Sequence, residues 1–190
     1  MADQPAPDWN CCLLTSDSTT VSLSCPLEGS QPWLAGRSLD VLRQVAQVRS
    51  DPEGERYAAG TRRGAPLILG EPLLWSGIQL VAEATELDSS HQGEVTLRLP
   101  PWSTLARAIP EVQFWQVVDA LALETHATCG VISDGRAIGF PDLDRPQLAL
   151  RRLQQAHLGV LAPQRWLGHL RPGSNPYLEL GRSRLLVVLE

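Results

Sequence analysis

The chain has 190 residues, of which 43% are hydrophobic and 19% charged, a balance that favours one globular domain and excludes a disordered chain. Its formal net charge is −5, and all 16 of its basic residues are arginines. This acidic balance argues against nucleic acid as a partner, because phosphate binding needs a basic face, and it is compatible with a basic protein partner. The sequence has no apolar run long enough to span a membrane and no signal-peptide pattern, so we expect a cytoplasmic protein.

The first part of the chain predicts a loose terminus, two short strands and a helix. Residues 1–10 contain two prolines, and we expect them to lie outside the single domain of residues 11–190. Strands are expected at 11–15 and at 21–25, because in the second of these apolar residues alternate with serines. A helix is expected at 38–49, where apolar residues recur at three and four positions and Ser38 is a plausible N-cap.

The middle of the chain predicts a β-hairpin after an irregular stretch. Residues 50–76 contain glycines and prolines that break short apolar runs, so we expect a short helix near Tyr57 and a buried loop at 67–69. Two strands follow, "IQLVAEATEL" and "GEVTLRLP", and the second alternates apolar and polar residues. Pro100 and Pro101 end it, because proline does not donate to a strand ladder.

The last part of the chain predicts two helices and three strands. The clearest helix starts at Pro110 and carries one apolar stripe, made of Phe114, Val117, Val118 and Leu121. A strand is expected at 129–133 and a third helix from Asp144 to about Gly159. Two closing strands are expected at 166–170 and 184–189.

This order of elements indicates the fold class. Strands neighbour strands as often as they neighbour helices, which favours an α+β domain with a mainly antiparallel sheet and about three helices packed on it. The final run "LLVVL" is apolar at every position, so we expect it to be an interior strand of that sheet.

The strongest candidate for catalysis is the segment "ETHATCG", which places Glu124, His126 and Cys129 close together in sequence. A thiol becomes a nucleophile when a nearby base helps to ionise it. However, His126 follows a helix and Cys129 enters an apolar strand, so a buried and inert cysteine is the favoured interpretation. The four cysteines form no C-x-x-C motif, and reduced thiols are expected.

No pattern in the sequence predicts a metal or a cofactor. The four histidines form no pair at metal-ligand spacing, and "GTRRGAPLILG" lacks both the dinucleotide and the P-loop spacing. We therefore expect no metal site and no cofactor.

The tryptophans and two acidic clusters are candidates for binding a protein. Trp115 and Trp166 lie in apolar patterns and are expected in the core, whereas four others lie near loop boundaries, where an exposed aromatic residue can anchor an interface. These four are Trp9, Trp33, Trp75 and Trp102. The acidic clusters are Glu83, Glu86 and Asp88 at a strand end, and Asp134, Asp142 and Asp144 in a loop. They form either a solvated face or a surface that meets a basic partner.

Five segments of the second half occur in an order that resembles a known family. They are "GEVTLRLP", a helix containing "FWQVVDAL", "THATCGVIS", "RWLGHLRPG" and "LGRSRLLVV". Residues 78–190 resemble the immunity proteins of bacterial polymorphic toxin systems, in particular the family catalogued as immunity protein fifty-two. The chain departs from that family's "GW-x-x-Y-L-S" strand, because Arg165, His169 and Arg171 stand where the family has Gly, Tyr and Ser.

The resemblance implies a non-catalytic inhibitor that binds a cognate toxin and covers a surface the toxin needs. Its acidic groups would speed the encounter with a basic toxin. Two alternatives remain open. One is a small enzyme that uses Cys129 and His126 or the carboxylates of residues 134–144, and the other is a structural or adaptor protein of a secretion or phage-like system.

Overall fold

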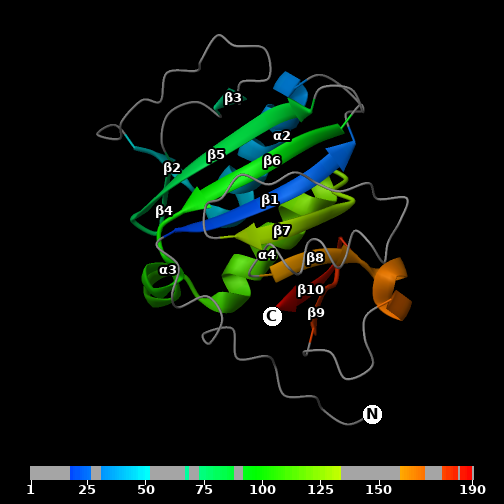
Figure 1. The fold of residues 1–190 in the computed structure, drawn as a ribbon. Coiled ribbons are helices and arrows are strands. Elements are labelled where there is room, and N and C mark those ends of the chain that lie inside the picture. Colours follow the sequence, from blue (N-terminus) through cyan, green and yellow to red (C-terminus); the bar gives the residue numbers. More distant parts are fainter. Residues whose placement is uncertain are drawn as a thin grey trace.

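A computed structural model describes residues 18–26, 31–51, 67–68, 73–87, 92–133, 159–169, 177–183 and 185–189 of the chain (Figure 1). The described residues form ten strands: β1 Thr19–Pro26, β2 Arg49–Ser50, β3 Leu67–Ile68, β4 Leu73–Trp75, β5 Ile78–Leu87, β6 Gln92–Leu99, β7 Cys129–Ser133, β8 Gly159–Pro163, β9 Tyr177–Leu180 and β10 Leu185–Leu189. They also form the helices α2 Gln31–Val41, α3 Trp102–Ala108 and α4 Glu111–Glu124, the π-helix η1 Leu42–Ala46 and the 3₁₀ helix η2 Gln164–His169.

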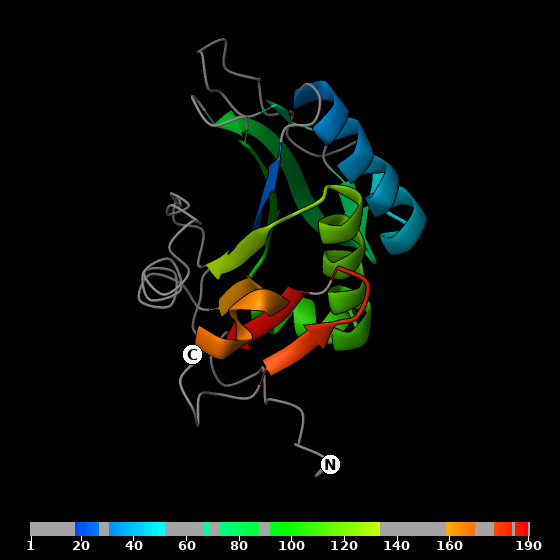
Figure 2. The same cartoon turned by 90° about the vertical axis from the view of Figure 1, so that its right-hand side faces the viewer.

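The described strands form one antiparallel sheet in the order β2-β4-β5-β6-β1-β7-β8-β10-β9, with β3 paired to β5. The longest pairings join β5 to β6 and β6 to β1. Helices α2 and α4 lie on one side of this sheet (Figure 2). The arrangement is a single α+β domain with a mainly antiparallel sheet, which confirms the predicted fold class.

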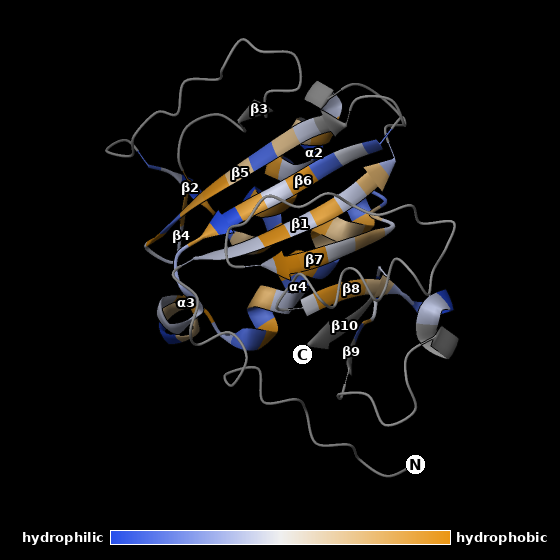
Figure 3. Ribbon diagram, viewed as in Figure 1, coloured by the Kyte–Doolittle hydropathy of each residue, from blue (hydrophilic) through white to orange (hydrophobic). Residues whose placement is uncertain are grey.

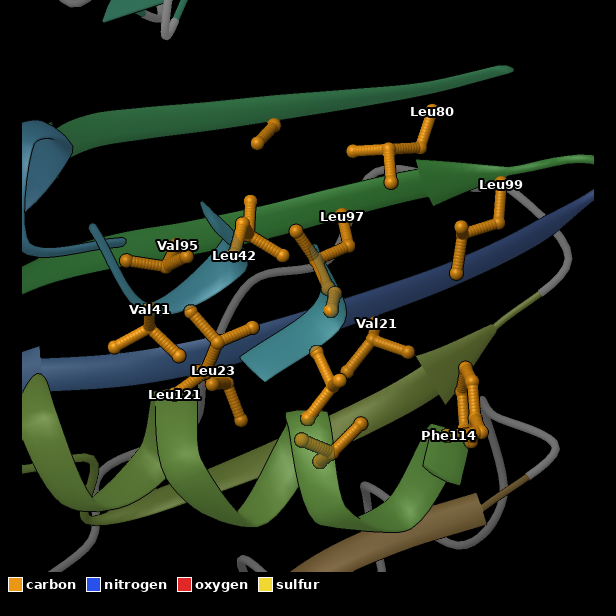
Figure 4. Close-up of a cluster of buried hydrophobic side chains, with 14 of the residues drawn as sticks. Val21, Leu23, Val41, Leu42, Leu80, Val95, Leu97, Leu99, Phe114 and Leu121 are labelled. Carbon is orange, nitrogen blue, oxygen red and sulfur yellow. The ribbon is translucent and has the colours of Figure 1, made fainter. Parts of the chain in front are cut away.

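The core lies between the sheet and these two helices. Along β1 and β6 alternate residues, such as Leu23 and Leu97, point to the helices, and the change of hydropathy along the strands is visible in Figure 3. Phe114 and Leu121 of α4 meet these side chains from the opposite side (Figure 4). The side chain of Leu121 is fully buried, and burial of such a side chain contributes about 1.5–3 kcal/mol.

Glycine is required at one position of the sheet. A Cβ atom at Gly130 of β7 would lie 2.6 Å from the carbonyl oxygen of Ser22 on β1 and 2.8 Å from a methyl carbon of Leu161 on β8. The absence of a side chain at Gly130 therefore lets these two neighbouring strands pack closely.

The C-terminal strand is an interior strand, as predicted. β10 pairs with β8 on one side and with β9 on the other. Its first residue, Leu185, is buried in the core. Strand β10 thus fills the place between β8 and β9 in the sheet.

Helix α2 differs from the expectation because it begins at Gln31, seven residues before Ser38. The side chain of Ser38 is buried, and its hydroxyl donates to the carbonyl oxygen of Leu34 one turn earlier (2.9 Å). Ser38 is therefore not an N-cap, and Arg49 lies in strand β2 and not in the helix.

Two other expectations about elements are wrong. Residues 164–169 form η2, although a strand was expected at 166–170. Strand β8 begins at Gly159, where a helix was expected to end. The expected loop at 67–69 contains strand β3 at Leu67–Ile68. The expected strand at 11–15, the helix near Tyr57 and the helix from Asp144 lie outside the described residues.

Candidate functional site

The outward face of α2 is the best candidate for a binding surface. Trp33, Gly36, Arg37 and Asp40 are all exposed, and their spacing of three, four and seven residues places them on one side of the helix. Leu34 and Val41 lie on the other side, where they are buried in the core. The burial of one face fixes which residues the helix presents to solvent. We call the four exposed residues the α2 face.

Trp33 is the exposed aromatic residue of this face. Its relative exposure is 37%, and among the described residues only one other large hydrophobic side chain, Val112 on α4, is exposed. An exposed tryptophan supplies a large apolar area together with an N–H donor, and tryptophan is enriched among residues that dominate the energy of protein interfaces.

Arg37, a second residue of the α2 face, forms an ion pair. Arg37, one turn after Trp33, donates to the carboxylate of Glu124 at the end of α4 (2.7 Å). Both side chains are well exposed, so the pair adds little to stability. It links Arg37 on α2 to the end of α4.

Gly36 leaves this surface flat. A Cβ atom built at Gly36 has no neighbour within 4 Å, so the space directly above this residue is open. A partner can therefore approach the backbone of α2 closely.

The other described tryptophans are buried. Trp75 and Trp102 pack on Phe114, with ring centroids 6.3 and 5.0 Å away, and Trp115 contacts the same ring edge-on at 4.9 Å. Trp115 and Trp166 lie in the core, as predicted, and Trp75 and Trp102 belong there too. Trp9 lies outside the described residues.

The two described cysteines are poorly suited to nucleophilic catalysis. Cys129 is fully buried, and burial raises the pKa of its thiol to about 12. Cys25 is fully buried as well, and burial raises the pKa of its thiol to about 12, a rise that the hydrogen bond with Thr125 (3.3 Å) opposes only in part. His126 is exposed in the turn after α4, with a backbone φ of 53°, and no hydrogen bond joins its ring to Cys129 in the described part of the chain.

Of the six acidic residues predicted to bind a partner, one has a described side chain. Glu83 on β5 is largely buried and accepts from Arg98 on β6 (3.2 Å). Glu86 belongs to β5, but its side chain is outside the described set, as are Asp88, Asp134, Asp142 and Asp144. The role of these acids in binding stays a prediction.

A second acidic residue, Glu94, lies close to that ion pair on the sheet face turned away from the helices. Burial raises the pKa of the Glu94 carboxyl, and Glu83 adds to the rise, while hydrogen bonds from Ser22 and Thr96 and the charge of Arg98 oppose it. The Thr96 hydroxyl donates to Glu94 at 3.2 Å and lies 3.3 Å from the Ser22 hydroxyl. The sequence analysis did not single out Glu94, although its position between Gly93 and Val95 in an alternating strand places it opposite the core.

Two classes of feature are absent from the described residues. They contain no group of three or more His, Cys, Asp or Glu residues that could hold a metal ion. None of the described helices is long and apolar enough to cross a membrane.

The sequence analysis named Trp33 as a possible interface anchor but missed the rest of the α2 face, because Gly36 was taken to precede the helix. Pro32, a residue typical of the first helical turn, is the signal that could have placed the start correctly.

Comparison with known proteins leaves the family unassigned. No family model and no curated protein matches the chain. Among solved structures, the Pseudomonas aeruginosa T6SS protein PA0821 is similar, with a TM-score of 0.46 and 11% identity over 90% of this chain and 67% of that one. This likeness is too weak to assign a family or a function, so the resemblance to immunity proteins stays a prediction.

Proposed function

We propose that this protein binds a cognate bacterial toxin and neutralises it by covering a surface that the toxin needs. The observation that carries the proposal is the exposed Trp33 on the α2 face, one helical turn before Arg37, which pairs with Glu124. An inhibitor of this kind needs a preorganised surface, and it needs no reactive group.

The geometry of the α2 face supports tight binding. Trp33 and Arg37 belong to two of the three residue types that dominate interface energies, and they lie one helical turn apart. Because α2 is packed on the sheet and on α4, its backbone is already ordered before binding. Little conformational entropy is then lost on association.

The charge of the chain supports a basic partner. A net charge of −5 attracts a basic toxin over long distances and raises the association rate at low salt. We propose that the predicted acidic residues act mainly in this way, whereas the α2 face supplies the contact. We also propose that the protein acts in the cytoplasm of the toxin-producing cell.

The alternative of an enzyme is less well supported. A nucleophilic Cys129 would need an accessible thiolate, and its thiol is buried with a raised pKa. An adaptor protein could use the same α2 face, so this alternative has to be separated by experiment.

Rescue of growth provides that experiment. The large reading frame next to the gene of this protein is expressed in a test strain, alone and together with this chain. We expect the neighbouring protein to stop growth and this chain to restore it. Trp33→Ala should abolish the rescue, whereas Val112→Ala, at the other exposed apolar side chain, should not. An adaptor protein would restore no growth, and a rescue that survives Trp33→Ala would exclude the α2 face.

A further inference from the structure

A polar groove lies at the end of the helical segment opposite to Trp33. It has a volume of about 400 Å³ and is formed by the end of η1, strand β2, the turn between β4 and β5, and the first turn of α4. The polar residues that line it are Gln47, Arg49, Ser76 and Gln113. Nothing in the proposed toxin contact uses this groove.

Three residues that line this groove have positive φ angles. Gln47 and Ser76 have φ angles of 53° and 51°, and they are two of the three non-glycine residues with positive φ in the described part of the chain. Gln47 directly follows the π-helix, and Ser76 precedes Gly77 in a two-residue turn in which both φ angles are positive. Positive φ at both positions is the favoured geometry of a two-residue hairpin turn, so only the left-handed Gln47 and the single-turn π-helix before it are of a kind concentrated at functional sites.

Arg49 supplies the charge of the groove. Its side chain is exposed, and it forms no ion pair with any carboxylate of the described residues. The acid nearest to it in sequence, Asp51, accepts a hydrogen bond from Gln79 (3.4 Å). The guanidinium of Arg49 therefore has donors available to a ligand.

The lining residues favour a carboxylate as that ligand. A guanidinium can donate two parallel hydrogen bonds to a carboxylate, and the amide groups of Gln47 and Gln113 and the hydroxyl of Ser76 add neutral donors. A nucleic acid would need several cations along its backbone, and the described lining contains one.

We infer that this groove binds a carboxylate side chain of an acidic polypeptide segment. The site is distinct from the α2 face, so the two proposals stand or fall separately.

A labelled oligo-glutamate peptide tests the inference directly. Its binding to the full chain is measured by fluorescence anisotropy at low ionic strength, for the wild type, Arg49→Gln and Arg43→Gln. Arg43 is a matched control, because it is exposed on η1 but does not line the groove. We expect saturable binding that Arg49→Gln weakens at least about tenfold, since a charge-assisted hydrogen bond is lost, while Arg43→Gln leaves it unchanged.

Two further measurements make the test specific. An oligo-glutamine peptide should not bind, and the NMR signals of Gly77 and of the Gln113 side-chain amide should shift as oligo-glutamate is added. Absence of saturable binding, equal loss in both arginine variants, or shifts that spare both signals would overturn the inference. Tighter Arg49-dependent binding of a single-stranded oligonucleotide would overturn it too, because the ligand would then be a phosphate backbone.

Discussion

One carboxylate oxygen of Asp119 accepts a hydrogen bond from the backbone N–H of Ser183 at 2.8 Å. The other oxygen accepts one from the backbone N–H of Arg182 at 3.0 Å. Asp119 lies in the middle of α4, whereas Ser183 lies in the turn between the two C-terminal strands. Asp119 is buried, so this pairing satisfies a charge that would otherwise be costly in the interior. It ties the C-terminal hairpin to the helix layer.

Asp119→Ala should therefore destabilise the fold. The substitution leaves two backbone N–H groups without an acceptor, and we expect the free energy of unfolding to fall by roughly 1.5–3 kcal/mol. Urea unfolding followed by circular dichroism measures the change. Asp40→Ala, at an exposed position on α2, is the matched control and should have little effect. Equal stability of the two variants would mean that the hairpin is held by its strand pairing alone.

Gly130→Ala should also destabilise the protein. The new methyl group would lie 2.6 Å from a backbone oxygen, which has less freedom to move than a side chain would have. Overpacking of this kind typically costs about 1–3 kcal/mol. Gly36→Ala serves as the comparison, because its methyl group meets open space and alanine favours a helix by roughly 0.5–1 kcal/mol over glycine. The thermal midpoint should fall for Gly130→Ala and rise for Gly36→Ala, and a rise for both would contradict the close strand approach.

The buried thiols should be inert in the folded protein. Burial raises the pKa of both Cys25 and Cys129 from 9.0 to about 12, so thiolate is scarce at pH 8. In a variant with Cys11 and Cys12 replaced by serine, a disulfide reagent such as DTNB should modify neither thiol until urea unfolds the chain. Rapid labelling of the native variant would show an accessible thiolate and would revive the enzyme hypothesis.

The same pKa values predict a loss of stability at high pH. A thiol whose pKa is raised by folding stabilises the folded state fully below pH 9.0, where the thiol of the unfolded chain is still protonated. This contribution is lost as the pH rises from 9.0 towards about 12. The urea concentration at the midpoint of unfolding should therefore fall as the pH rises across this range. In Cys25→Ala the midpoint should fall less steeply with pH.

The Glu94 carboxyl should add to the stability of the folded protein in mild acid. Burial raises the pKa of this carboxyl, so its contribution to stability is present below the ordinary value of 4.5 and is lost as the pH rises through the folded value. Glu94→Gln keeps an acceptor for Thr96 and removes this dependence on pH. Thermal midpoints measured from pH 4 to 7 should fall less steeply for the variant, and parallel curves would contradict the raised pKa.

Regular alternation made part of the fold predictable from the sequence. The strands around Leu23 and Leu97 and the helix around Leu121 were predicted, because one buried face imposes a period of two or of about 3.6 residues. Helix α3 was missed because it spans only seven residues after Pro101. The apolar run around Trp166 was taken as a strand, since short apolar runs fit a strand and a helix equally well.

The candidate site was less predictable than the fold. Several tryptophans lie near apolar runs, and which one faces solvent depends on tertiary packing and not on local pattern. Trp75 became buried because Phe114, 39 positions later in the chain, stacks on it. Trp33 is exposed because Leu34 next to it takes the buried face of α2.

The central claim is that the α2 face contacts a toxin, and Gly36 offers the sharpest test of it. A Cβ atom at position 36 has no neighbour within 4 Å and the position is exposed, so Gly36→Arg should leave the fold intact while it blocks the approach of a partner. Gly36→Ala is the matched control.

The deciding measurement is the affinity for the purified product of the neighbouring large reading frame, which we propose to be the toxin, obtained by isothermal titration calorimetry. Gly36→Ala should bind as the wild type does, and Gly36→Arg should bind at least about thirtyfold more weakly, as expected when a central contact worth about 2 kcal/mol is lost. Wild-type affinity of a folded Gly36→Arg variant would contradict the account.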